Sequence, residues 1–138
     1  MPDTSSLAGK LGIAPGATVT LLHAPKDFSI ELPAGALLRR QVRKGVDVVL
    51  AFYSSNGVLE AEIERLSQVI FPDGSFWISW PKKSSGVKTD LDDHVIRDLA
   101  LPRGLVDNKV CAIDETFTAL RFVWRRSLRN ERRPPPRA

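Results

Sequence analysis

The stretch of this sequence whose residue types best suit chemistry is a basic, hydroxyl-rich loop. It follows an apolar run that ends at a proline, and a glycine closes it; its candidate ligand contacts are Lys82, Lys83, Ser84 and Ser85. Ammonium groups, hydroxyls and exposed backbone N–H groups are donors that hold anions. The loop predicts a site for a small anionic or nucleotide-like ligand. An interpretation of the same residues as solvated loop charges carries equal weight.

Three further polar residues directly follow other predicted strands. His23 and Lys26 come after the apolar run at 18–22, and Tyr53 comes after the run at 46–52. In a parallel sheet the loops that follow the strands gather at one edge, where ligands bind. We therefore expect these three residues to line the same pocket as the lysine loop. His23 has the alternative role of an ordinary polar loop residue, because the sequence names no partner for it.

Other candidates for chemistry have simpler structural explanations. Three aspartates at positions 90, 92 and 93 lie at a predicted helix start, where Thr89 is the expected N-cap. The glutamates of the predicted helix 58–70 are expected on its solvated face. Two histidines and Cys111 lack the spacing of a metal site. No metal site is predicted, and because no nucleophile–base pair is evident, the sequence leaves open whether the chain is an enzyme.

The hydrophobic patterns predict an α/β fold. Strands are expected at 18–22, 36–40, 46–52 and 75–80, and an antiparallel hairpin is expected from strands at 108–114 and 117–124. Helices are expected at 58–70 and about 89–101, with a short one after Ser5 or Ser6. This order predicts a three-layer, mostly parallel Rossmann-like sheet of about five or six strands, closed by the C-terminal antiparallel hairpin.

Length and charge predict one domain with a basic tail. The 138 residues divide into a single expected domain over 1–126 and a disordered, proline-containing tail over 127–138. The net charge of +4 comes from the C-terminal end, since residues 121–138 carry +6 and the preceding 120 residues carry −2. Binding to nucleic acid or to an acidic partner is therefore expected only through the tail.

The sequence also predicts a location and excludes some classes of protein. No apolar run approaches the roughly 20 residues of a membrane-spanning helix, and the N-terminus does not resemble a signal peptide. One cysteine excludes an intrachain disulfide framework. A cytoplasmic protein without membrane contact is expected, and nothing in the sequence selects an oligomeric state.

Several runs resemble a bacterial family described only as domain of unknown function 3052, over about residues 7–125. The matching runs are residues 10–16, 80–86 with a distinctive Trp-Pro-Lys-Lys, 89–91, 104–107 and 109–115. The order of elements is also similar to the C-terminal half of class I methyltransferase-like Rossmann folds, in which a Pro-Asp-Gly turn precedes the fifth strand, as at residues 72–74 here. The resemblance implies a Rossmann-like fold and carries no established activity.

Three functions follow from these observations. The first is the binding of a small anionic or nucleotide-like ligand at the carboxyl edge of the sheet. The second is an S-adenosylmethionine-dependent, methyltransferase-like enzyme, although residues 23–28 lack the Gly-x-Gly turn with which such folds approach the cofactor. The third is an interaction protein that uses the arginine-rich tail. The cofactor, if there is one, stays unidentified.

Overall fold

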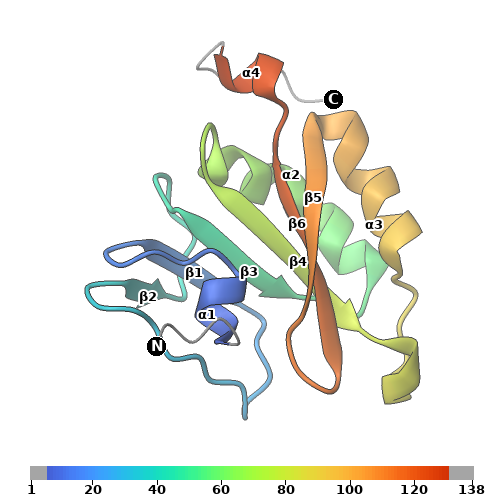
Figure 1. The fold of residues 1–138 in the computed structure, drawn as a ribbon. Helices are drawn as coiled ribbons and strands as arrows, with labels where there is room; N and C mark the ends of the chain where they lie inside the picture. The colour runs from blue at the N-terminus through green and yellow to red at the C-terminus, as the bar shows by residue number, and fades with distance from the viewer. Residues whose placement is uncertain (1–5, 131–138) are drawn as a thin grey trace.

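A six-stranded mixed sheet forms the centre of the computed structural model, which describes residues 6–130 (Figure 1). The strands are β1 (Thr18–Leu22), β2 (Leu37–Arg39), β3 (Val48–Phe52), β4 (Ser75–Pro81), β5 (Leu105–Ala112) and β6 (Phe117–Trp124). The helices are α1 (Leu7–Lys10), α2 (Asn56–Ile70), α3 (Asp93–Ala100) and α4 (Arg126–Asn130), with two 3₁₀ turns, η1 (Lys83–Ser85) and η2 (Leu101–Arg103).

The strand order is β2-β1-β3-β4-β6-β5, and it corrects the predicted fold class. Strands β2, β1, β3 and β4 are parallel, whereas β6 is antiparallel to both of its neighbours, β4 and β5. The predicted hairpin of β5 and β6 is confirmed, but it places β6 inside the sheet rather than at its end. The expectation of a mostly parallel, three-layer Rossmann-like sheet is therefore wrong.

Only one face of the sheet has a layer of long helices. On that face α2 and α3 cover alternate residues of the central strands, among them Val49, Phe76 and Ile78. The opposite face carries the four-residue helix α1 and the irregular segment that leads from β1 to β2 (Figure 1). Phe28 from this segment packs edge to face on Phe52, with ring centroids 5.0 Å apart. This segment contains Pro25 and Pro33 and forms turns rather than a helix.

The two central strands are buried along their whole length. All five residues of β3 and all seven of β4 are buried. Near-continuous apolar runs, such as those of these two strands, are typical of strands covered on both faces. Trp77 and Trp80 point to opposite faces, as their odd spacing predicts.

Beyond β6 the chain turns into α4. Leu128 of α4 packs against the core, and the Arg125 guanidinium donates a hydrogen bond to the Leu101 carbonyl (2.9 Å). Residues 127–130, which were predicted to belong to a disordered tail, are part of α4. Residues 131–138, with the remaining tail arginines, lie outside the described residues. Within the described part of the chain, no helix is long and apolar enough to cross a membrane.

The N-cap of α3 is Asp92 and not the predicted Thr89. Asp92 Oδ1 accepts a hydrogen bond from the Val95 N–H (2.8 Å), and the helix begins one residue after the cap. Thr89 instead donates its hydroxyl proton to the Ser54 carbonyl (2.7 Å), which joins two loops. The capping-box pattern misplaced the helix start by three residues because threonine and aspartate are both good caps.

Removing this cap is expected to destabilise the fold modestly. We expect Asp92→Ala to lower the free energy of unfolding by about 1 kcal/mol, since an N–H of the first turn loses its acceptor. Asp98, exposed within the same helix, provides the matched control, and Asp98→Ala is expected to change stability by less than about 0.5 kcal/mol. Urea denaturation of both variants measures the difference; equal stabilities would show that the cap has no role.

Candidate functional site

An open depression lies where β3 and β4 end, at the edge of the sheet where the sequence predicted a site. Its volume is about 640 Å³, and its lining residues come from the β3–α2 turn and from the loop after β4: Ser54, Ser55, Lys83, Gly86, Val87, Lys88, Thr89 and Asp90. Both loops follow parallel strands, so the topology of that half of the sheet brings them together. The predicted location is thus a concave surface, although the residues around it differ from the predicted set.

Two of the predicted ligand contacts make hydrogen bonds within the protein. The Lys82 ammonium donates to the carbonyl oxygen of Asp114 (2.7 Å), which attaches the end of β4 to the β5–β6 turn. The Ser85 hydroxyl donates to the Lys82 carbonyl (2.7 Å) and accepts from the Val87 N–H (3.2 Å). Gly86 follows with φ of +77°, a conformation that few residues other than glycine adopt readily. The Lys82 and Ser85 side chains therefore shape the loop from within.

Lys83 and Lys88 are the cations of the depression. Both are exposed, and neither ammonium group makes a hydrogen bond or an ion pair with another residue in the described range 6–130. Ser55 caps α2 by accepting from the Val58 N–H at a long 3.5 Å, so its hydroxyl proton is available to an acceptor. The Ser54 hydroxyl is likewise unengaged among the described residues. Lys88 was not among the predicted contacts; its place in the loop, six residues beyond Lys82, was the signal.

A carboxylate already occupies the N-terminus of α2, beside the depression. Asp90 Oδ1 accepts the N–H of Asn56, the first residue of that helix, at 2.7 Å. A negative charge is favourable at this end of a helix, where the N–H groups lack partners. The predicted role of the aspartates at this loop end was to cap their own helix, but Asp90 caps α2. Its charge offsets one of the two lysine charges that line the depression.

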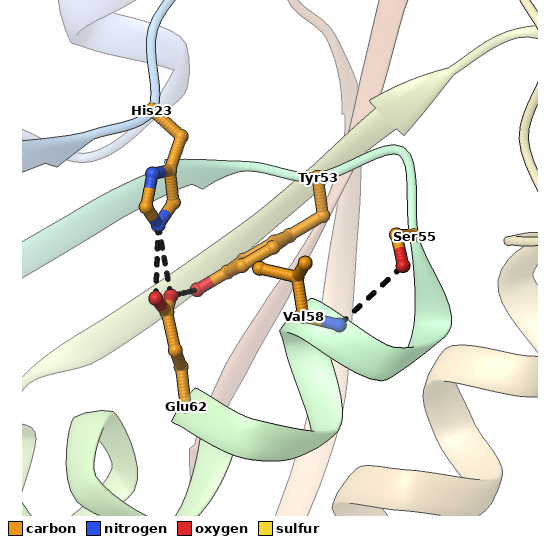
Figure 2. A network of polar contacts seen from close by, with 5 residues as sticks. All are labelled: His23, Tyr53, Ser55, Val58 and Glu62. Carbon is orange, nitrogen blue, oxygen red and sulfur yellow. Dashed lines mark hydrogen bonds and ion pairs between the residues drawn. The ribbon is translucent and has the colours of Figure 1, made fainter.

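His23 and Tyr53 belong to a separate cluster, centred on Glu62 of α2 (Figure 2). His23 Nε2 lies 2.9 Å and 3.1 Å from the two carboxylate oxygens of Glu62, and the Tyr53 hydroxyl donates to Oε1 at 2.6 Å. The two rings meet edge to face, with centroids 5.4 Å apart. Since a carboxylate only accepts hydrogen bonds, Nε2 is the donor in this contact. His23 also adopts a left-handed φ of 58°, which is uncommon outside glycine.

The environment of Tyr53 strongly favours its neutral form. Burial raises the pKa of the phenol well above its ordinary value, and the hydrogen bond and negative charge of Glu62 raise it further. Tyr53 is therefore a permanent hydrogen-bond donor at physiological pH. The cluster has a carboxylate-held imidazole, a feature of general-base sites, but no serine, cysteine or threonine nucleophile is bonded to it among the described residues.

The environment of the Glu62 side chain differs from the prediction. Its helix was predicted to turn all its acids to solvent, yet the Glu62 side chain is 35% exposed and bonded on two sides. The available signal was its position three residues after Leu59 and four before Leu66, both in the buried stripe. A residue at that spacing flanks the buried face and reaches the sheet edge.

The structure therefore divides the single pocket that was predicted. Lys83 lines the depression, His23 and Tyr53 bind Glu62, and Lys82 and Ser85 support the loop. Ser84 and Lys26 are exposed, do not line the depression and make no hydrogen bond or ion pair within residues 6–130. Whether any of these residues contacts a ligand stays a prediction.

Within residues 6–130, neither the cysteine nor the acidic side chains form a reactive thiol site or a metal site. Cys111 is buried on β5, and burial raises the pKa of its thiol, which keeps it in the unreactive form. Among residues 6–130, no three histidine, cysteine, aspartate or glutamate side chains lie close enough to hold a metal ion.

Comparisons with known proteins add no relative: no family model matches the chain, and no curated protein is similar to it. The resemblance to domain of unknown function 3052 stays a prediction.

Proposed function

We propose that this protein binds a small ligand carrying an anionic group in the depression between the β3–α2 turn and the loop after β4. The observation that carries the proposal is that Lys83 and Lys88 both line this depression without a partner among the described residues. Ammonium groups without carboxylate partners are available to an external anion. The hydroxyls of Ser54 and Ser55 add donors to the same wall.

The charge and size of the depression limit the ligand. Asp90 offsets one lysine, so the lining carries a net charge of +1 and favours a ligand with one anionic group over a polyphosphate. A volume of about 640 Å³ lies within the range of small-molecule sites. Because the depression is open, its charges are screened by salt, and we expect affinity to fall as ionic strength rises. The proposed role is binding rather than catalysis, since no nucleophile–base pair lines the depression.

The test compares ligand retention in three proteins. Native mass spectrometry of the gently purified protein identifies a bound anion, and calorimetric titration with adenosine monophosphate and with acetate measures binding of defined probes. Lys83→Ala combined with Lys88→Ala is expected to weaken binding at least about tenfold, or about 1.4 kcal/mol. Lys26→Ala removes an exposed lysine that does not line the depression and is expected to leave binding unchanged. Equal affinity in all three proteins would refute the proposal.

The other two predicted functions gain no support. The methyltransferase-like hypothesis stays a prediction, and residues 23–28, which follow β1, contain no glycine that would let the backbone approach a cofactor. The role proposed for the tail depends largely on Arg132, Arg133 and Arg137, which lie outside the described residues. Binding of nucleic acid or an acidic partner by those arginines therefore stays a prediction.

A further inference from the structure

The outer edge of the sheet at β2 combines exposed apolar side chains with a run of cations. Leu37 and Leu38 are 54% and 40% exposed, the largest exposures of leucine in the described chain. We define the β2 edge surface by six residues of β2 and the loop that follows it: Leu37, Leu38, Arg39, Arg40, Arg43 and Lys44. Residues 37–46 contain no acid, so this segment carries a charge of +4.

The backbone of β2 is paired on one side only. Among residues 6–130, strand β1 is its single neighbour, and the Leu37 N–H donates to the Ala17 carbonyl at 2.9 Å. Successive residues of a strand direct their N–H and C=O groups to opposite sides. The N–H and C=O of Leu38 therefore point away from β1, toward the open edge, where they can pair with another strand.

The opposite edge of the sheet is protected in a way that β2 is not. Strand β5 has a bulge between Asp107 and Lys109, and Asp107 is held by Arg97 of α3 at 3.0 Å. Bulges and held charges disfavour the addition of a strand. The register of β2 with β1 has no bulge. The cations of the β2 edge surface would still repel a second copy of the same edge, because like charges would face each other.

We propose that the β2 edge surface docks an acidic, extended peptide segment of another protein, which adds to the sheet as a strand beside β2. Such a segment supplies backbone partners for Leu38, apolar side chains to cover the two leucines, and carboxylates for the four cations. This surface lies at the β2 edge, away from the depression at the ends of β3 and β4, so the inference is independent of the proposed function.

Other polyanions fit the surface less well. A nucleic acid would engage the cations but leave the leucines uncovered, and no aromatic side chain in residues 37–46 provides a stacking platform. An anionic membrane would cover the leucines but leave the N–H and C=O of Leu38 without partners in an apolar medium. An added acidic strand can pair with the cations, cover the leucines and bond the backbone of Leu38 at the same time. Because β2 has only three residues, few backbone hydrogen bonds form and the contact is expected to be weak and salt-dependent.

Fluorescence anisotropy with a labelled eight-residue peptide, in which pairs of glutamates alternate with pairs of valines, tests the proposal on the full chain, because consecutive valines reach both faces of the sheet, as Leu37 and Leu38 do. We expect saturable binding that weakens as salt rises, and no binding by a matched peptide in which lysines replace the glutamates. Two competitors distinguish the other polyanions: a single-stranded oligothymidylate and vesicles that contain phosphatidylserine. Absence of binding at millimolar glutamate–valine peptide would overturn the proposal, as would tighter binding of either competitor.

Substitutions at the two edges of the sheet test whether the peptide binds at the β2 edge surface. Arg40→Glu combined with Arg43→Glu is expected to weaken peptide binding at least tenfold. Leu38→Pro removes the outward N–H while sparing the hydrogen bonds to β1, and is expected to weaken binding about fivefold. Lys109→Glu changes the same kind of exposed charge on the β5 edge and is expected to leave binding within twofold. Circular dichroism verifies that each variant is folded, and equal binding by the Arg40/Arg43 variant and the Lys109 control would overturn the assignment.

Discussion

Tyr53 is expected to keep its phenolic proton in the folded protein at a pH one unit above the ordinary tyrosine pKa of about 10, where most of the unfolded chain is ionised. Burial opposes the charged phenolate. The carboxylate of Glu62 accepts a hydrogen bond from the phenol, with the two oxygens 2.6 Å apart, and repels a second negative charge. Tyr53 is the only tyrosine in the chain, so tyrosinate absorbance measures this residue alone. A pH titration of the native protein, with the protein in denaturant as the reference, gives the shift directly.

A variant of Glu62 separates the causes of this shift. Glu62→Gln removes the negative charge but keeps an oxygen that accepts a hydrogen bond. The pKa of Tyr53 should then fall below that of the unmodified protein and stay above 10, because burial is the largest cause and is retained. Glu60→Gln, an exposed change on the same helix, should leave the titration unaltered. A native titration curve that coincides with the curve in denaturant would contradict the buried, hydrogen-bonded Tyr53.

The same shift has a consequence for stability with a definite sign. Because the folded state holds the phenolic proton more tightly than the unfolded state, this contribution is complete below about pH 10 and is lost as pH rises toward the raised pKa. Between about pH 10 and the raised pKa, the free energy of unfolding should fall by up to about 1.4 kcal/mol per pH unit through this group. Tyr53→Phe removes the titrating proton, so the difference between the two proteins, measured by urea denaturation, should narrow as pH rises.

The second large effect is expected at Trp77. Its side chain is fully buried on the face of the sheet that α1 covers, and its indole N–H donates to the Leu11 carbonyl at 3.0 Å. Trp77→Ala leaves a large cavity and removes that donor. We expect a loss of about 3–5 kcal/mol in the free energy of unfolding, which approaches the whole stability of many small domains.

Two further variants make this prediction specific. Trp77→Phe keeps much of the ring but leaves the Leu11 carbonyl without its donor, so its loss should be smaller, about 1–3 kcal/mol. Val110→Ala, at a side chain that is 66% exposed, should change stability by less than about 0.5 kcal/mol. Chemical denaturation followed by circular dichroism ranks the three. A Trp77→Ala protein as stable as the Val110→Ala protein would show that α1 does not depend on this contact.

Elements whose pattern is local could be predicted from the amino-acid sequence. The continuous apolar runs of β3 and β4, the stripe of α2 and the turn between β5 and β6 each predict their element from neighbouring residues. The edge of the sheet where β3 and β4 end was also predictable, because a loop that follows a parallel strand lies there. Lys83 was placed at the depression for this reason.

Which elements and which polar groups meet depends on the path of the whole chain. Periodicity says which side of a strand is buried, but it does not say that β6 inserts beside β4 or that an irregular segment covers the second face. Glu62 and His23 are 39 positions apart, and Asp90 is 34 positions from the helix that it caps. A hydrogen bond between such groups depends on the chain path that hydrophobic packing sets. Local pattern therefore placed the loops of the candidate site, and tertiary packing determined which of their side chains remained available to bind.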